Sequence, residues 1–241
     1  MKFILLFIVL FCLSPVFAAD APVVAFAPEF PQSMRAEVGQ LLLQAWQRVA
    51  PTEEILPLTV EWAADKEAFG RRVGKNPEHL MAAANWQAST IILNGEAFRQ
   101  ADPSERLVTI IHEYVHLLIG QSEAFIPLWL EEGLAMHLSG DLQRAGSEWQ
   151  LTAAHSFDRL IPIREIDSRF PEEPARRSLA YRQAYSLTGF VLERDYPITG
   201  AAGLLDDLLD EDHRVRLEMW TSDRMAMHGL ELAWRKTLGS V

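Results

Sequence analysis

The sequence predicts an α+β fold, with a small sheet in the N-terminal part and a mainly helical C-terminal part. Two observations support this prediction. Segments typical of strands occur only before residue 100, whereas the chain after Asp102 carries apolar residues almost throughout at helical spacing. No internal repeat divides the chain. We therefore expect one domain over residues 19–241, with a strand-containing part over 19–100 and a helical part over 101–241.

The N-terminal part contains short apolar or alternating segments that predict strands and two segments with three-and-four spacing that predict helices. The predicted strands are residues 23–26, 58–62, 80–86 and 90–93, and the predicted helices are residues 33–49 and 65–73. Asn94-Gly95 predicts a turn after the last strand. We expect the sheet formed by these strands to pack against the first helix of the C-terminal part.

The helix over residues 103–119 has the clearest boundaries. Asp102-Pro103-Ser104-Glu105 supplies an N-cap acceptor, a proline at the first helical position and a glutamate at the third, which together predict a capping box. Gly120 is predicted to end the helix in the left-handed conformation. Gly, Pro and charged residues separate the helices predicted beyond it, and Arg169 to Pro174 is predicted to be a loop. These later helices are 127–139, 149–160, 178–195, 201–210 and 224–238.

Residues 112–116 of this helix are His-Glu-Tyr-Val-His. A spacing of four places His112 and His116 on one helix face, where two imidazoles can bind the same metal ion. Glu113 lies beside them, where a carboxylate can take a proton from a metal-activated water. The flanking residues are strongly apolar, so the helix is predicted to be buried, and buried His and Glu side chains need partners. The pentapeptide therefore predicts a zinc hydrolase with one Zn²⁺ per chain.

The first 18 residues are typical of a secretory signal peptide. Lys2 provides a basic start, an apolar run follows it, and Val16-Phe17-Ala18 is a small-residue cleavage pattern, so we expect cleavage after Ala18. The protein is then exported, to the periplasm or the extracellular space. Cys12 is the only cysteine, so the mature chain has no disulfide and its zinc ligands can only be His and carboxylate side chains.

The charge of the chain limits its partners. The formal net charge is −11, and removal of Lys2 with the signal peptide makes it more negative still. Such acidity argues against nucleic acid or an anionic membrane surface as a partner. No apolar run after the signal peptide reaches membrane-spanning length, so no stable membrane anchor is expected. The sequence does not specify the oligomeric state.

The third zinc ligand is predicted in the segment Trp-Leu-Glu-Glu-Gly-Leu-Ala, residues 129–135, because a catalytic zinc keeps three protein ligands. This helix is apolar on nearly all sides, so its two adjacent glutamates are not typical of a solvated face. Glu131 borders a leucine stripe, while Glu132 shares its side with Trp129 and Met136. Periodicity alone does not choose between the two.

His-Glu-Tyr-Val-His, 15 intervening residues and Glu132-Gly133-Leu134-Ala135 together resemble the gluzincin metallopeptidases. The similarity is greatest to bacterial peptidase-MA-like domains and extends over roughly residues 80–241. It implies a zincin-like fold in which Glu132, the glutamate before the glycine, is the third ligand. It also implies that a tyrosine of a later helix donates a hydrogen bond to the oxyanion, and Tyr181 matches better than Tyr185. Gly133 is then expected to let its helix approach the His112 helix closely.

The resulting interpretation is an exported zinc metallopeptidase that acts on a peptide or protein substrate. Glu113 is the expected general base, and the strand over residues 80–86 is expected to align the substrate by main-chain pairing. His137, five residues after Glu132, is one further residue that could contact the site. Two alternatives remain at this point: an inactive zinc-bound scaffold that binds a cell-envelope partner, and a zinc hydrolase of non-peptide amides in the cell wall. The sequence specifies neither substrate nor cleavage preference.

Overall fold

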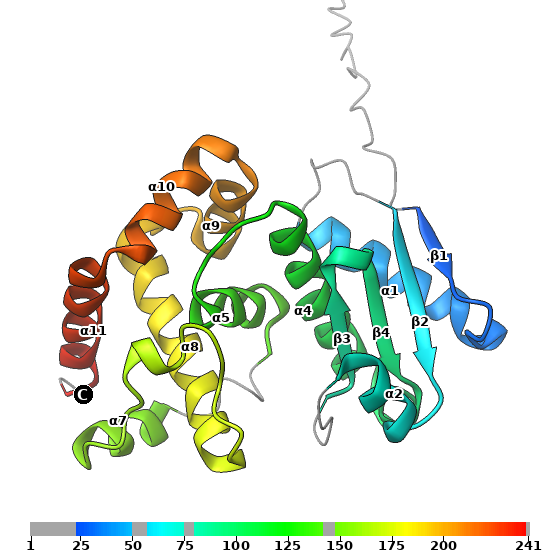
Figure 1. Cartoon of the computed structure of the whole chain (residues 1–241), viewed down its shortest axis with the longest axis horizontal. Coiled ribbons are helices and arrows are strands. Elements are labelled where there is room, and N and C mark those ends of the chain that lie inside the picture. The colour runs from blue at the N-terminus through cyan, green and yellow to red at the C-terminus, as the bar shows by residue number, and fades with distance from the viewer. Residues whose placement is uncertain (1–22, 50–56, 75–79, 142–147, 240–241) are drawn as a thin grey trace, which may run out of the picture.

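The computed structural model of the chain describes residues 23–49, 57–74, 80–141 and 148–239. Its architecture is α+β, with a four-stranded sheet in the N-terminal part and helices in the remainder, as predicted (Figure 1). The predicted signal peptide, its cleavage site and Cys12 lie outside the described residues. No helix among those residues is both long enough and apolar enough to cross a bilayer.

The sheet has the strand order β1-β2-β4-β3. β1, β2 and β4 are parallel, and β3 pairs with β4 in the antiparallel direction. All five residues of β4 are buried, which is typical of a central strand covered on both faces. β3 is an edge strand, so its outer side is not paired with another strand. The strands are β1 Val24–Phe26, β2 Leu58–Ala63, β3 Ala82–Asn85 and β4 Thr90–Asn94.

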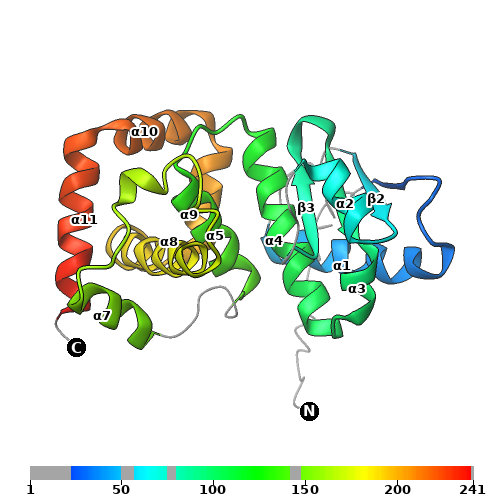
Figure 2. The same ribbon diagram turned by 60° about the horizontal axis from the view of Figure 1, so that its bottom comes forward.

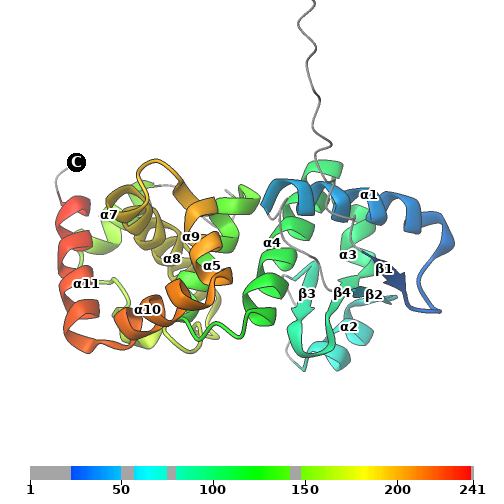
Figure 3. The ribbon, with the colours of Figure 1, turned by 90° about the horizontal axis from the view of Figure 1, so that it is seen from above.

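Helices cover both faces of the sheet (Figure 3). The helices α1 (Gln32–Val49) and α4 (Pro103–Gln121) pack on one face together with alternate residues of β2 and β4, and this side joins the main core. The short helix α2 (Lys66–Val73) covers the opposite face, where Phe69 packs in a small separate cluster. Because α4 contacts both the sheet and the C-terminal helices, it lies at the junction of the two parts of the molecule.

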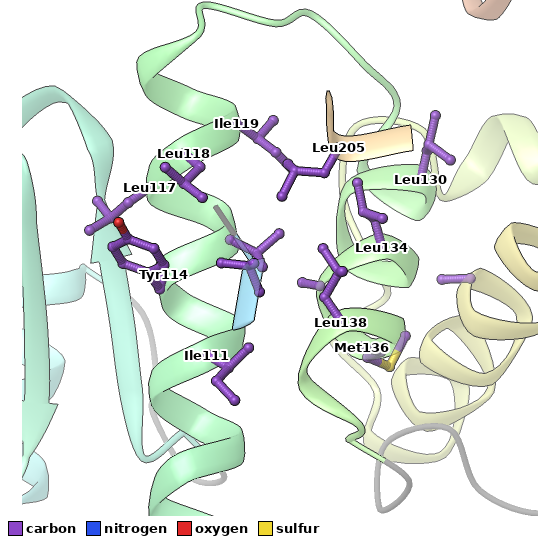
Figure 4. Packing of buried hydrophobic residues seen from close by; sticks show 14 of the residues in the cluster. Ile111, Tyr114, Leu117, Leu118, Ile119, Leu130, Leu134, Met136, Leu138 and Leu205 are labelled. Atoms are coloured by element: carbon purple, nitrogen blue, oxygen red, sulfur yellow. The ribbon is translucent and has the colours of Figure 1, made fainter. Parts of the chain in front are cut away.

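The C-terminal part is helical, and its longest helix, α8, packs against α5. In Figure 2, α7, α9, α10 and α11 surround these two helices. Apolar side chains of α4 and α5 meet between the two parts, where Ile111 and Ile119 face Leu134 and Leu138 (Figure 4). Burial of each such side chain contributes roughly 1.5–3 kcal/mol as an upper estimate. The helices are α5 Leu128–Ser139, α7 Glu148–Ser156, α8 Pro174–Asp195, α9 Gly200–Leu209, α10 Glu211–Ser222 and α11 Arg224–Leu238.

The two ends of α4 differ in how well the sequence predicted them. At the start, the Asp102 carboxylate accepts from the backbone N–H groups of Ser104 and Glu105, and the Glu105 carboxylate accepts from the Asp102 N–H, which confirms the capping box. At the other end the prediction was wrong, because α4 continues through Gly120 to Gln121. A Cβ at Gly120 would lie 2.3 Å from the Cβ of Trp86, so this glycine permits the close approach of the segment that follows β3.

Two α-helices occupy segments for which the sequence did not predict a helix. A turn was expected at Asn94-Gly95, but the helix α3 (Gly95–Gln100) starts there, and the Asn94 side chain caps it by accepting from the N–H of Ala97. The second is α10, whose N-cap is Asp210. Both helices begin at an Asn or Asp whose side chain can favour either a turn or a helix start.

Candidate metal centre

Two histidines of α4 form the base of the site. His112 and His116 lie one helical turn apart, with ring centroids 4.9 Å from each other and Nε2 atoms 3.2 Å apart. His112 is almost fully buried, and His116 is partly buried. The burial of α4 between the sheet and α5 therefore orients both imidazoles toward one common point.

The helix α5 adds a carboxylate to the two histidines. Oε2 of Glu132 lies 3.3 Å from Nε2 of His112 and 3.7 Å from Nε2 of His116. The three ligand atoms lie within 4.8 Å of one another. This Glu132 oxygen is buried and has no hydrogen-bond partner of adequate geometry, although it faces two imidazole nitrogens. A buried carboxylate oxygen is costly unless a cation joins it, so the donor set fits a metal ion.

The ionisation of these groups is strongly coupled. Burial opposes protonation of His116, but the adjacent Glu132 and Glu131 carboxylates outweigh it and hold the pKa of His116 well above its ordinary value. Burial likewise disfavours the Glu132 carboxylate, yet the two histidines hold the pKa of Glu132 well below the usual range. Glu132 is therefore ionised and ready to act as a ligand, whereas a metal must displace a proton from His116.

Glu131 also contacts His116, although from the opposite side. Its Oε1 lies 2.7 Å from Nδ1 of His116, while Nε2 of the same ring faces Glu132. A metal-binding histidine commonly donates the N–H of its other nitrogen to a carboxylate, which sets the tautomer and the orientation of the ring. The adjacent glutamates therefore have different positions: Glu132 belongs to the ligand group, and Glu131 accepts the hydrogen bond that orients His116.

Glu113 lies on the side of α4 that faces the sheet edge. The residue is buried, and its Oε2 accepts a hydrogen bond of 2.8 Å from the backbone N–H of Ala84 in β3. No sequence pattern indicates this contact, because the donor is a main-chain group. Glu113 is not a member of the group formed by His112, His116 and Glu132.

The sequence-based expectation for Gly133 was wrong about the helix that it approaches. A Cβ at this position would lie 2.1 Å from Oγ1 of Thr188 and 2.6 Å from the carbonyl oxygen of Ala184, and both residues belong to α8. Neighbouring helical residues point about 100° apart. Since Glu132 faces α4, the next residue faces α8 instead. The glycine thus allows α8 to support the back of the helix that carries Glu132.

We expect Gly133→Ala to destabilise the protein by about 3 kcal/mol, because the new methyl group meets backbone as well as side-chain atoms of α8. The matched control is Gly229→Ala in α11, where nothing lies within 4 Å of the added Cβ. It should stabilise by roughly 0.5–1 kcal/mol through helix propensity. Urea unfolding of both variants measures the difference. Equal stability of the two variants would contradict the packing described for Gly133.

The two tyrosines of α8 have different surroundings. Tyr181 packs edge-on against Phe170, with ring centroids 4.7 Å apart. Tyr185 is stacked on His137 of α5 at 4.0 Å, and the backbone carbonyl of Tyr185 lies 2.9 Å from Nε2 of His137. Burial lowers the pKa of His137, which favours the neutral ring. His137 therefore packs α5 against α8 and is not a member of the grouped ligands. The role of Tyr181 at the oxyanion stays a prediction.

Comparison with known proteins gives one family match. A family model described as the peptidase MA superfamily matches residues 81–240. No curated protein and no solved structure gives a significant match. The matched range covers more than half of the chain and includes β3, α4, α5 and α8 with the histidine–glutamate group. The chain therefore belongs to the peptidase MA superfamily.

Proposed function

We propose that this protein is an exported zinc metallopeptidase with a zincin-like fold. One observation carries the proposal: in a member of the peptidase MA superfamily, His112, His116 and Glu132 converge on one point. The buried Glu113 directly follows His112 in the same helix. Its export is supported by the N-terminal sequence, with its basic start, apolar run and small-residue cleavage pattern.

The distances between the ligand atoms support zinc as the ion. Tetrahedral coordination with bonds of about 2.0–2.1 Å separates neighbouring donor atoms by roughly 3.3–3.4 Å. The observed separations are 3.2 Å between the two Nε2 atoms and 3.3 and 3.7 Å from these atoms to Glu132 Oε2. Two imidazoles and one carboxylate also leave a fourth position, which is typical of catalytic rather than structural zinc.

Each of the side chains around this centre has its own role in peptide hydrolysis. Bound zinc supplies a Lewis acid that activates water and polarises the substrate carbonyl. Glu113 accepts the proton of the attacking water and transfers it to the leaving amine. Glu131 holds His116 in its ligand tautomer. Tyr181 donates a hydrogen bond to the developing oxyanion. Apart from the N–H of Ala84, which donates to Glu113, the outward main-chain groups of the edge strand β3 can align an extended peptide.

The test uses the mature protein, residues 19–241, on a diverse peptide library with and without a chelator. We expect about one zinc per chain, hydrolysis that stops on chelation and hydrolysis that returns with added zinc. His116→Ala serves as the control, because two remaining ligands hold zinc poorly. Zinc content of the variant equal to that of the parent would remove His116 from the ligand set. Hydrolysis of cell-wall amides but of no peptide would replace the peptidase proposal by the amidase alternative.

A further inference from the structure

The base of the proposed reaction is held by the edge strand of the sheet. Ala84 N–H donates to Oε2 of Glu113 over 2.8 Å. In an antiparallel pair, successive residues point their N–H and C=O groups alternately toward and away from the partner strand. The N–H of Asn94 in β4 donates to the carbonyl of Met81, so Met81 is hydrogen-bonded to β4. By alternation, Ala83 is also hydrogen-bonded to β4. Ala82 and Ala84 therefore direct their main-chain N–H and C=O groups away from β4. The Glu113 carboxylate therefore occupies a position on the free edge of the sheet.

Contacts at both ends hold β3 on the same face of α4. Thr109 Oγ1 lies 3.6 Å from the sulfur of Met81, just before the strand. Trp86, just after it, fills the space beside Gly120. Thr109, Glu113 and Gly120 lie on one helix face, because they are separated by intervals of four and seven residues. Figure 1 shows β3 as the strand beside α4. The position of Ala84 relative to Glu113 is thus determined by packing on either side of it.

Small side chains allow this close approach. Ala82 and Ala84 lie on the face of β3 that packs into the main core with α4, whereas Ala83 belongs to the cluster on the opposite face. A larger side chain at the fully buried Ala82 would separate the strand from the helix, whereas Ala84 is only partly buried. The run of three alanines is therefore suited to bringing a backbone N–H within hydrogen-bonding distance of a helical carboxylate.

We propose that the main-chain N–H of Ala84 positions Glu113 for its two proton transfers. The hydrogen bond fixes Oε2 and the plane of the carboxylate, so Oε1 is the oxygen that accepts and returns the proton. The same strand offers the outward C=O groups on which a peptide substrate would align, so one rigid element positions both the base and the substrate. The catalytic part of this inference rests on the proposed function, but the hydrogen bond itself does not.

The hydrogen bond can be tested without a substrate, by amide hydrogen exchange of the zinc-loaded mature protein labelled with ¹⁵N-alanine. Ala82, Ala83 and Ala84 give three neighbouring signals. Glu113→Ala should speed exchange at Ala84 by about tenfold or more. Exchange at Ala83, which pairs within the sheet, and at Ala82 should respond little. Glu113→Gln, which keeps an acceptor oxygen, should retain most of the protection. Equal acceleration at all three alanines, or none at Ala84, would overturn the proposal.

The catalytic role is tested with Ala84→Pro, which removes this N–H at an outward-facing edge position where proline does not interrupt the ladder. We expect kcat to fall about tenfold or more, with KM and zinc content close to those of the parent. In a variant that already carries Glu113→Gln, Ala84→Pro should reduce kcat little further, because the amide acts through Glu113. If the two substitutions instead reduced kcat independently, so that the double variant lost the product of the two single reductions, the positioning role would be overturned. A parent that hydrolyses nothing would instead overturn the proposed function, and with it the catalytic role, while the exchange result would stand.

Discussion

Glu113→Gln should reduce hydrolysis by about 10²–10⁴-fold while leaving zinc binding and folding close to those of the parent. The substitution removes the proposed general base, but it preserves the size of the side chain. The amide oxygen of the glutamine can still accept from the N–H of Ala84, so the surroundings of this buried position need not rearrange. The substitution leaves His112, His116 and Glu132 unchanged, so zinc binding should be retained.

The comparison requires kcat, zinc content and urea unfolding of parent and variant under identical conditions. Loss of activity with equal zinc content and equal stability would identify Glu113 as the base. A variant that retains the activity of the parent would assign Glu113 a structural role and require another base for the reaction.

Glu132→Ala should abolish tight zinc binding, whereas Glu131→Ala should weaken it by only about 10–100-fold. The first change removes a carboxylate whose oxygen lies 3.3 Å from one ligand nitrogen and 3.7 Å from the other. The second removes the acceptor 2.7 Å from Nδ1 of His116, so the ring keeps its ligand nitrogen but loses its orientation. The resemblance assigned the ligand role to Glu132 and not to Glu131, so it implied that Glu131→Ala leaves most of the binding intact. The contact with His116 is the reason to expect a measurable loss.

Competition with a chromogenic chelator measures both affinities on one scale. Glu131→Gln is a useful third variant, because its amide oxygen can still accept from Nδ1, and it should bind zinc more tightly than Glu131→Ala. A large loss at Glu131 with an unaffected Glu132 variant would show that the ligand assignment is displaced by one residue.

Local features were predictable where one short segment contains all the interacting groups. The capping box of α4 depends on Asp102 and Glu105 alone, and both are visible in the sequence. The spacing of His112 and His116 likewise requires only that the segment be helical. The strand segments were also found. Their order and the antiparallel direction of β3 were not predicted, because pairing depends on residues far apart in the chain.

The environment of each residue could not be predicted in the same way. Helical spacing indicates which residues share a face, but it does not identify the neighbour that meets this face. For this reason Gly133 was assigned to the His112 helix, although it contacts α8, and Gly120 was expected to end α4, although it makes room for Trp86. The contact between Ala84 and Glu113 left no trace in the sequence, since any residue except proline supplies a backbone N–H.

The grouped ligands come from two helices that belong to different parts of the molecule, since α4 packs on the sheet and α5 packs on α8. A bound ion therefore acts as a crosslink between these parts, and it stabilises the folded state by about 4 kcal/mol when its free concentration is 1,000 times its dissociation constant. If the protein is exported as proposed, to surroundings where other proteases are present, a molecule without its ion would open more often and be degraded sooner. The lifetime of the protein, as well as its catalytic rate, would then depend on the concentration of free zinc in its surroundings.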